Sequence, residues 1–220
     1  EVHHPDWFEE HAGLDESGKG DLFGPLVSVC VVADGDMVRK WIDIGIRDSK
    51  KVGDKQAKAL AAEIRKSRGV AVGITYSSMA KYNEMMAKPR ANLNLLLAWM
   101  HAKSLESALA KRWAPWGLLD QFSKQPLVQR YFKNSDFELR MRTKAEEDPV
   151  VAAASIVARA VFLEQLEKLS EQAGVELSKG SGAGAKTQAV EIVRKHGKEK
   201  LAEFAKMHFK TANEAIKLAE

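Results

Sequence analysis

The chain has 220 residues, 45% hydrophobic and 29% charged, which is typical of a globular domain with one sizeable core. It carries 34 Lys and Arg against 30 Asp and Glu, so a net charge of +4 permits a polyanionic partner without requiring one. The single cysteine, Cys30, excludes an internal disulfide and a cysteine-based zinc site. No apolar run approaches the length of a membrane span and no secretory segment opens the chain, so we expect a cytoplasmic protein without a membrane partner.

The first half of the chain predicts strands and helices in alternation. Residues 1–11 are polar and aromatic, and we expect a tail or linker remnant there, followed by the domain over 12–220. Residues 12–33 predict a strand, a glycine turn and a second, β-branched strand. An exposed helix with Asp54 as its cap is expected over 54–67, and a strand over 70–76.

The second half continues the same alternation. Apolar residues at helical spacing predict a core-facing helix over 92–112, and short apolar or alternating runs predict strands over 117–122 and 137–143. A long helix is expected from Asp148 to about Leu169, and a glycine-rich break precedes two or three short basic helices within 187–220. This pattern predicts an α/β chain, and the tight turn between the first two strands favours a mixed central sheet flanked by helices.

Two adjacent acids, Asp15 and Glu16, stand directly before Gly18, Lys19 and Gly20. Acids collect divalent cations, while glycine-flanked amides and a lysine collect phosphate. Residues 13–19 also satisfy the first seven positions of a phosphate-binding P-loop, but Gly20 stands where that motif needs Ser or Thr, and a strand follows where it needs a helix. A P-loop is therefore the weaker interpretation.

Further acids stand at the ends of other predicted elements. Asp120 ends an apolar strand, where an acid has no packing role, and Glu146 lies between a strand and the long helix. Neighbouring strands are only ~5 Å apart, so acids at their ends converge, and hard oxygen ligands select magnesium or manganese. Asp15 and Glu16 are adjacent on a strand and point to opposite faces, so a shared site requires a distorted strand near Ser17 and Gly18.

Basic side chains near these acids have both a functional and a structural interpretation. Lys50 and Lys51 follow Asp48 and Ser49, either as phosphate ligands or as a solvated basic loop, and Lys144 stands two residues before Glu146 with the same two interpretations. His101 lies on a predicted apolar helix, and we expect it to be a packed structural residue. His208, near the C-terminus, is also expected to pack, although it is a candidate to reach a scissile phosphate.

Taken together, these motifs resemble the type 2 ribonucleases H, and within them ribonuclease HIII more than ribonuclease HII. The resemblance runs from about residue 13 to 214 through blocks in a specific order: DESGKGDLFGPL, DSKK, LNLLLAWMH, LLDQF, TKAE, AAASIVAR, GAGAK and FAKMHF. Lys19 stands where ribonuclease HII usually has arginine, and Glu146 where it usually has aspartate. The resemblance implies a ribonuclease H-like fold and a four-acid site of Asp15, Glu16, Asp120 and Glu146.

That resemblance also implies the reaction and its partners. It implies two-metal hydrolysis, with two Mg²⁺ or Mn²⁺ ions, of the RNA strand of an RNA/DNA hybrid, giving 5′-phosphate and 3′-hydroxyl ends by a monomer without an obligate protein partner. The implied substrate-contacting residues are Ser17, Gly18, Lys19, Gly20, Ser49, Lys50, Lys51, Asn94, Lys144 and His208. Ribonuclease HIII normally bears an N-terminal substrate-binding domain, which the residues before His11 are too few to form.

Other functions remain open on sequence alone. Cleavage at single ribonucleotides or RNA–DNA junctions in duplex DNA, as in ribonuclease HII, is the nearest alternative. A nucleotide-binding P-loop protein and a nucleic-acid-binding module without catalysis are the others. A nucleotide-dependent thermal shift separates the P-loop protein, and binding without cleavage separates the module.

Overall fold

The computed structural model describes residues 3–46 and 49–220 of the chain. Its strands are β1 (His11–Ser17), β2 (Val27–Ala33), β3 (Ala71–Thr75), β4 (Trp116–Asp120) and β5 (Glu138–Arg142). Its α-helices are α1 (Gly35–Asp43), α2 (Asp54–Lys66), α3 (Met79–Met86), α4 (Leu93–Lys111), α5 (Pro149–Ala173), α6 (Ala183–His196), α7 (Lys198–Leu201) and α8 (Lys210–Ala219). The chain divides into two compact units, the first holding the sheet and the second the C-terminal helices.

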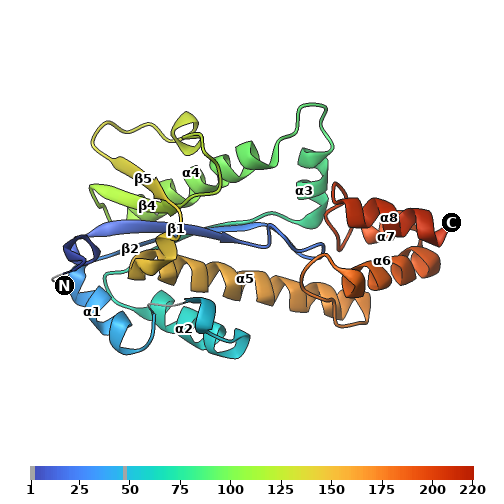
Figure 1. The fold of residues 1–220 in the computed structure, drawn as a ribbon, viewed down its shortest axis with the longest axis horizontal. Coiled ribbons are helices and arrows are strands. Elements are labelled where there is room, and N and C mark those ends of the chain that lie inside the picture. Colours follow the sequence, from blue (N-terminus) through green and yellow to red (C-terminus); the bar gives the residue numbers. More distant parts are fainter. Residues whose placement is uncertain (1–2, 47–48) are drawn as a thin grey trace. The chain divides into compact units, whose positions relative to one another are not determined.

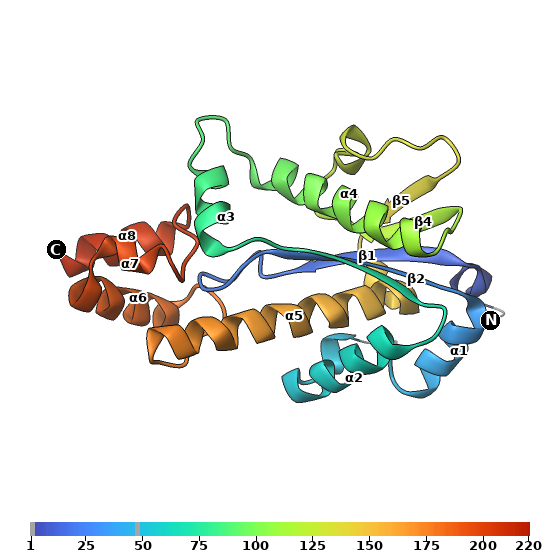
Figure 2. The same cartoon turned by 180° about the vertical axis from the view of Figure 1, so that it is seen from behind.

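The first unit comprises the described residues of 1–17, 27–75 and 94–160. Its five-stranded sheet has the order β3-β2-β1-β4-β5, in which β1 pairs antiparallel with β2 and parallel with β4. The remaining pairs are antiparallel for β2 and β3 and parallel for β4 and β5. In the ribbon views, α4 covers one face of this sheet, and α1, α2 and the first part of α5 cover the other (Figure 1 and Figure 2). The predicted mixed sheet flanked by helices is confirmed.

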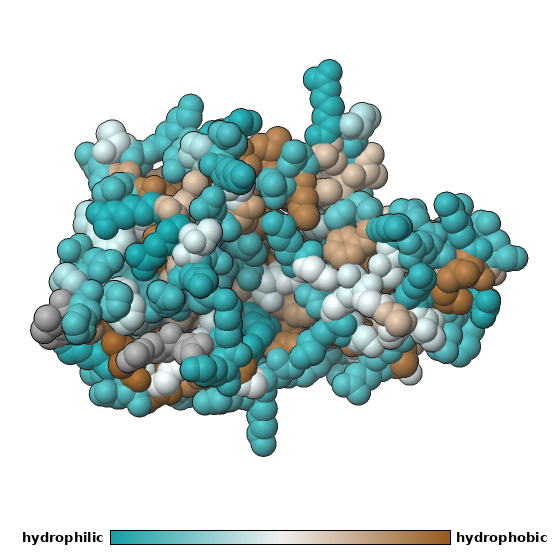
Figure 3. All heavy atoms as spheres, viewed as in Figure 1, coloured by the Kyte–Doolittle hydropathy of each residue, from teal (hydrophilic) through white to brown (hydrophobic). Residues whose placement is uncertain are grey.

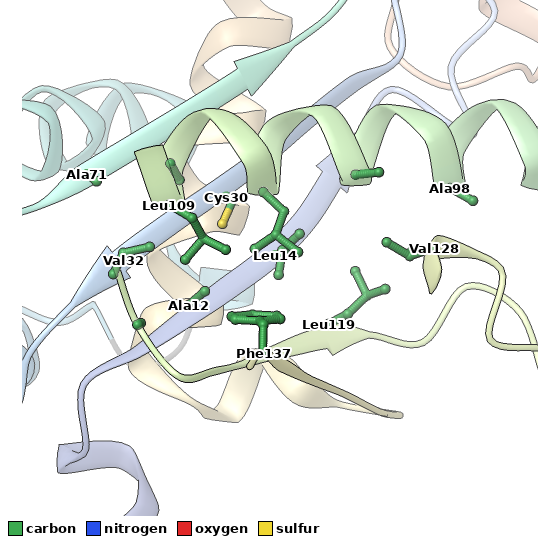
Figure 4. Close-up of a cluster of buried hydrophobic side chains, with 14 of the residues drawn as sticks. Ala12, Leu14, Cys30, Val32, Ala71, Ala98, Leu109, Leu119, Val128 and Phe137 are labelled. Carbon is green, nitrogen blue, oxygen red and sulfur yellow. The ribbon is translucent and has the colours of Figure 1, made fainter. Parts of the chain in front are cut away.

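The face of the sheet toward α4 holds a continuous apolar core. Alternate residues of β1, Ala12 and Leu14, point into it together with Leu119 of β4, as period-two geometry requires. They pack with α4 residues that include Ala98 and Leu109, and Figure 4 shows these side chains gathered between the strands and the helix. Because side chains alternate along a strand, burial of Ala12 and Leu14 on this side determines toward which face of the sheet each later residue of β1 points.

The opposite face lies against the beginning of α5. Leu118 of β4 packs here with Val151 of α5. Gly13 of β1 lies so close to the backbone of Val150 that a side chain there would collide with it. A glycine at this position therefore lets β1 approach the helix backbone directly.

Helix α5 corrects one expectation about the membrane. It is long and apolar enough to span a bilayer, with a mean hydropathy of 1.5 over an 18-residue window, but 78% of that window is buried within the protein. A long apolar helix that is mostly buried within a protein is a core helix, because its apolar side chains pack against neighbouring elements. The face of the molecule in Figure 3 is mostly hydrophilic, with hydrophobic residues in small separate patches.

The second unit comprises residues 18–26, 76–93 and 161–220. Helices α6, α7 and α8 confirm the predicted C-terminal helices, but α6 begins at Ala183, inside the glycine-rich stretch that was expected to be a break. An isolated antiparallel bridge joins Phe23 to Ala205, and both residues are fully buried. The stretch between the two first strands is therefore built into this unit by backbone pairing.

Three local predictions differ from the structure. The segment expected to be a tail contains a 3-10 helix (Pro5–Phe8), and His11 is a fully buried residue of β1. Its imidazole bonds to the buried carboxylate of Asp148, which fixes the start of the strand. Helix α2 begins after Gly53, and Asp54 lies in its first turn instead of capping it. Helices α1 and α3 were not predicted, although α1 buries Val38 and Trp41 three residues apart on one side.

Candidate active site

Two carboxylates stand side by side where the parallel strands β1 and β4 end. Leu14 pairs with Leu119, and Asp15 and Asp120 are the next residue on each strand. Adjacent strands are separated by ~5 Å, so these two acids are neighbours at one edge of the sheet. The backbone N–H of Ala145 donates to Oδ1 of Asp120 over 3.0 Å and fixes that carboxylate.

Strand β1 stays regular through both of its acids. Asp15 pairs with Val29 and Glu16 with Ser28 in an unbroken antiparallel register that continues to Ser17. The distortion that a site shared by both acids was expected to require near Ser17 and Gly18 is therefore absent from β1. The two carboxylates instead approach one edge of the sheet from its two faces.

Each of the two faces provides its acid with a separate partner. Asp15 lies on the side of α5, where the hydroxyl of Ser155 hydrogen-bonds to it. Glu16 lies on the side of α4, where Nε2 of His101 is 3.0 Å from its Oε2. Asp15 also accepts a bond of 2.8 Å from the backbone N–H of Glu16. The pair of acids is thus held from both sides of the sheet.

His101 belongs to a buried hydrogen-bonded chain that sequence reasoning missed. Its Nδ1 lies 2.8 Å from Oγ of Ser28, which in turn bonds to Ser104 of α4, and Ser104 bonds to Thr75 of β3. The imidazole is fully buried. The prediction of a satisfied packing histidine is right about its burial but omits its contact with Glu16. The sequence signal for this contact was a polar residue, His101, at a position of the predicted helix that is otherwise apolar.

Glu146 comes from a short 3-10 helix (Ala145–Glu147) between β5 and α5. Lys144 begins this turn with φ 56°, and it is the one non-glycine residue with positive φ in the described parts of the chain. Such a conformation is unfavourable for L-residues, and strain of this kind clusters at functional sites. Asp148, not Glu146, caps α5, since its Oδ1 accepts from the N–H groups of Val150 and Val151. Glu146 is therefore not needed as the helix cap.

The site concentrates negative charge in a partly buried place. Burial and then the neighbouring charge of Glu16 raise the pKa of Asp15 well above its usual value. Burial also raises the pKa of Asp120, with the charges of Glu146 and Glu16 acting in the same direction. Burial is the larger cause of both raised pKa values, and repulsion between the ionised carboxylates adds to it.

One lysine offsets part of this repulsion. The ammonium of Lys50 forms an ion pair with the carboxylate of Glu146, and 73% of the Lys50 side chain is exposed. Burial by itself raises the pKa of Glu146, but the hydrogen bond and charge of Lys50, a backbone hydrogen bond and the charge of Lys144 together outweigh it, and the pKa is lowered overall. The charge of Lys50 also acts on Asp120 and Asp15. A cation therefore already stands beside Glu146, within reach of the charges of Asp120 and Asp15.

This donor set fits a divalent cation. Hard carboxylate oxygens are the ligands of Mg²⁺ and Mn²⁺, and a cation would relieve the repulsion that raises the pKa of Asp15 and Asp120. Among residues 3–46 and 49–220, no three acidic, histidine or cysteine side chains are close enough together to form a ready-made metal site. The acids would have to draw together to share an ion.

The predicted substrate residues fall into both units. Ser17 and Asn94 are half-buried, and Ser49 is buried, in the unit that carries the acids, where Lys50, Lys51 and Lys144 are exposed. Asp48 of the DSKK motif lies outside the described residues. Gly18, Lys19, Gly20 and His208 belong to the second unit.

Within that second unit, His208 is held by a hydrogen bond, whereas Gly20 has open space around it. Nε2 of the exposed His208 lies 2.6 Å from the hydroxyl of Tyr82. Gly20 is exposed, and nothing lies within 4 Å of the position where its side chain would be. No helix lies between Gly20 and β2, a stretch described throughout, so the geometry of a P-loop is absent there.

Comparison with known proteins places this chain in a family. The family model of ribonuclease HII matches residues 12–212. A ribonuclease HIII of Protochlamydia amoebophila is 39% identical over 203 residues, covering 91% of this chain and 66% of that protein. The ribonuclease HIII of Chlamydia pneumoniae is 41% identical over 210 residues, covering 92% of this chain and 68% of that protein. The chain thus spans about two thirds of the length of these curated relatives.

A solved structure agrees with the sequence comparison. The structure of Bst-RNase HIII in complex with Mn²⁺ is 32% identical and superposes with a TM-score of 0.85, covering 97% of this chain and 71% of that one. This match confirms the predicted ribonuclease H-like fold. The chain therefore belongs to the ribonuclease HII family, the type 2 ribonucleases H, and within that family it is similar to ribonuclease HIII.

Proposed function

We propose that this chain is the catalytic part of a ribonuclease HIII that hydrolyses the RNA strand of RNA/DNA hybrids. The observation that carries the proposal is that Asp15, Glu16, Asp120 and Glu146 lie near enough to one another for their charges to act on Asp15 or Asp120. Family membership supports the hydrolase activity, and the Mn²⁺ complex of a 32% identical relative supports the use of a divalent metal.

The four acids would act as the ligands of two ions, Mg²⁺ or Mn²⁺. When bound, the ions would activate a water molecule and stabilise the leaving oxygen of an in-line displacement at phosphorus. Asp15 is the proposed shared ligand, because burial is the largest cause of its raised pKa and the charges of Glu16 and Asp120 both act on it. Ser155 and His101 would hold the carboxylates of Asp15 and Glu16 in place from the two faces of the sheet.

The outcome of the reaction follows from which bond breaks. Water attacks the phosphorus of the scissile RNA linkage, and the bond from phosphorus to the 3′ oxygen breaks. The products would carry a 5′-phosphate and a 3′-hydroxyl. Lys50, which already pairs with Glu146, would neutralise charge beside the scissile phosphate.

The substrate would be held by backbone and by basic side chains. Glycine permits close approach of the backbone at Gly18 and Gly20, where contact with a 2′-hydroxyl would distinguish RNA from DNA. Lys19, Lys51 and Lys144 are proposed phosphate ligands, which add salt-dependent affinity without sequence preference. Ser17, Ser49, Asn94 and His208 are the remaining proposed contacts.

A second substrate class has one observation in its favour. The family model that matches residues 12–212 is that of ribonuclease HII, so cleavage at single ribonucleotides in duplex DNA is the alternative activity. We further propose that the protein acts in the cytoplasm as a monomer, without an obligate protein partner.

One panel of substrates tests the proposal. An RNA/DNA hybrid, a DNA duplex with a single ribonucleotide and an all-DNA duplex are each incubated with Mg²⁺ and with Mn²⁺. We expect cleavage of the hybrid at many positions, intact DNA, and no cleavage when the metal is chelated. Cutting confined to the single ribonucleotide would favour the second activity. Binding of the hybrid without cleavage in either metal would refute both.

A further inference from the structure

Lys206 is a buried charged residue for which the proposed function has no role. It lies between α7 and α8 in the second unit and is fully buried. Its ammonium donates to the backbone carbonyl of Asp21 over 2.7 Å and to that of Gly24. Both carbonyls belong to residues 18–24, here called the glycine loop, which contains the Gly18, Lys19 and Gly20 motif. The lysine thus reaches across 182 sequence positions to hold one short loop.

The surroundings of Lys206 are aromatic. Its Nζ lies 5.9 Å from the ring centres of Tyr82 and Phe209 and 6.0 Å from that of Phe162. Burial lowers the pKa of Lys206 to about 7, while the charge of Asp21 acts in the opposite direction. A neutral amine keeps two N–H donors, so both carbonyl bonds can persist in either protonation state.

Backbone bonds hold the same loop to the same segment. The N–H of Lys206 donates to the carbonyl of Leu22 over 2.8 Å, and the N–H of Gly24 donates to the carbonyl of Phe204 over 3.0 Å. With the two side-chain bonds of Lys206, the carbonyls of Asp21, Leu22 and Gly24 are all occupied by one residue. Lys206 is therefore the main polar anchor of the loop.

Two glycines of the loop have backbone conformations and close contacts that a larger residue would not tolerate. Gly18 and Gly24 have φ of 92° and 87°, and a side chain at Gly24 would come within 2.8 Å of the Phe162 ring. The loop therefore has one defined backbone path at its two ends. Gly20, between them, is exposed with open space around it.

We propose that Lys206 is a positioning residue, which holds the glycine loop in the conformation that presents Gly18, Lys19 and Gly20 to the RNA strand. The inference rests on the proposed function, in which this loop contacts the substrate. Core packing alone would not require a lysine, since burying an ammonium is costly and an apolar side chain of similar size would fill the same space. The carbonyls of Asp21 and Gly24 are what require a donor here.

The test compares Lys206→Met with a matched control in the same buried cluster. Lys206→Met fills the volume but removes the donor. Tyr82→Phe keeps the aromatic ring and removes only the bond to His208, so the carbonyls of the loop stay occupied. Amide hydrogen exchange over residues 18–24 is measured by mass spectrometry in the free protein, and KM and kcat are measured on an RNA/DNA hybrid. Lys206→Gln, which keeps an N–H donor on a shorter stem, is measured alongside in case the methionine variant does not fold.

We expect exchange in the glycine loop to rise roughly tenfold in Lys206→Met and to stay unchanged in Tyr82→Phe. In Lys206→Met we expect KM for the hybrid to rise with little change in kcat. In Lys206→Gln we expect the exchange rate and KM to rise as well, but by less. Unchanged exchange would overturn the anchoring role, and faster exchange with an unchanged KM would overturn the positioning role. A wild-type protein inactive on the hybrid would refute the proposed function, while the exchange measurement would still decide whether Lys206 anchors the loop.

Discussion

Nε2 of His101 lies 3.0 Å from Oε2 of Glu16, and this contact fixes the one acid of the site that faces α4. Asp15, its neighbour in sequence, faces α5 and is held there by Ser155. Because β1 is regular, the two carboxylates reach the edge of the sheet from opposite faces and each needs its own support. The geometry of the acid pair thus depends on one residue from each flanking helix.

Replacing His101 tests this support. His101→Ala leaves Glu16 without its partner, and loss of the group that orients a metal ligand typically lowers metal affinity or activity by roughly 10- to 100-fold. We expect the Mn²⁺ concentration for half-maximal cleavage to rise, while the affinity for the hybrid stays constant. Ser104→Ala is the control, since it alters the same hydrogen-bonded chain without touching Glu16. Equal effects of the two variants would show that His101 acts only through packing.

Lys50 tests the neutralisation of the acidic edge. Its ammonium pairs with Glu146 and its side chain is largely exposed, so Lys50→Ala should leave the fold intact. Removing one phosphate contact should weaken hybrid binding and reduce the slope of log affinity against log salt by about 1. Lys55→Ala, an exposed lysine of α2, is the matched control. A salt slope identical to that of Lys55→Ala would contradict a phosphate role for Lys50.

Lys144 allows backbone strain to be separated from substrate contact. Its φ of 56° suits glycine, so Lys144→Gly should leave the free energy of unfolding unchanged or raise it by up to about 1 kcal/mol. Lys144→Val, with a β-branched side chain, should lower it by about 1–2 kcal/mol. Urea denaturation measures both variants. Weaker hybrid binding by the stable glycine variant would assign Lys144 to the substrate, and unchanged binding would leave it a turn residue alone.

The buried pair of His11 and Asp148 predicts a pH dependence of stability. Burial lowers the pKa of His11, but the bond and charge of Asp148 outweigh it, so the net pKa is raised above 6.5. The stabilisation is therefore complete below about pH 6.5 and is lost as the pH rises through the raised value. We expect the difference in free energy of unfolding between wild type and His11→Gln to shrink as the pH rises above about 6.5. A difference that grows with pH would mean that folding lowers the pKa of His11, and a constant difference would mean that folding leaves it unchanged.

Much of the fold could be predicted because its signals are local. The β-branched run before Ala33 and the helical period of Leu93, Leu97 and Met100 identify a strand and a helix without knowledge of the rest. The short helix α3 was missed, since its eight residues give a weak period, whereas α1 was missed although Val38 and Trp41 have helical spacing. His11 was assigned to a tail because its partner, Asp148, is 137 residues away.

Part of the candidate site could likewise be predicted from the sequence, and part could not. Acids at the ends of apolar strands are visible in sequence, which is why Asp15 and Asp120 were identified as neighbours. The partners that hold the acids are not visible, because His101 and Ser155 come from helices whose packing face is set by tertiary structure. The role of Lys206 was hidden for the same reason, since its carbonyl partners lie in a loop far away in the sequence.

The most direct test of the four-acid metal site is cleavage of an RNA/DNA hybrid by Asp15→Asn in Mg²⁺ and in Mn²⁺, with hybrid binding measured in parallel. Asparagine preserves the shape of the side chain and removes its charge. We expect the cleavage rate to fall on the order of 10³-fold or more while the dissociation constant of the hybrid stays within about threefold of wild type. Full activity in Asp15→Asn would contradict the metal site, and with it the account of how these residues act.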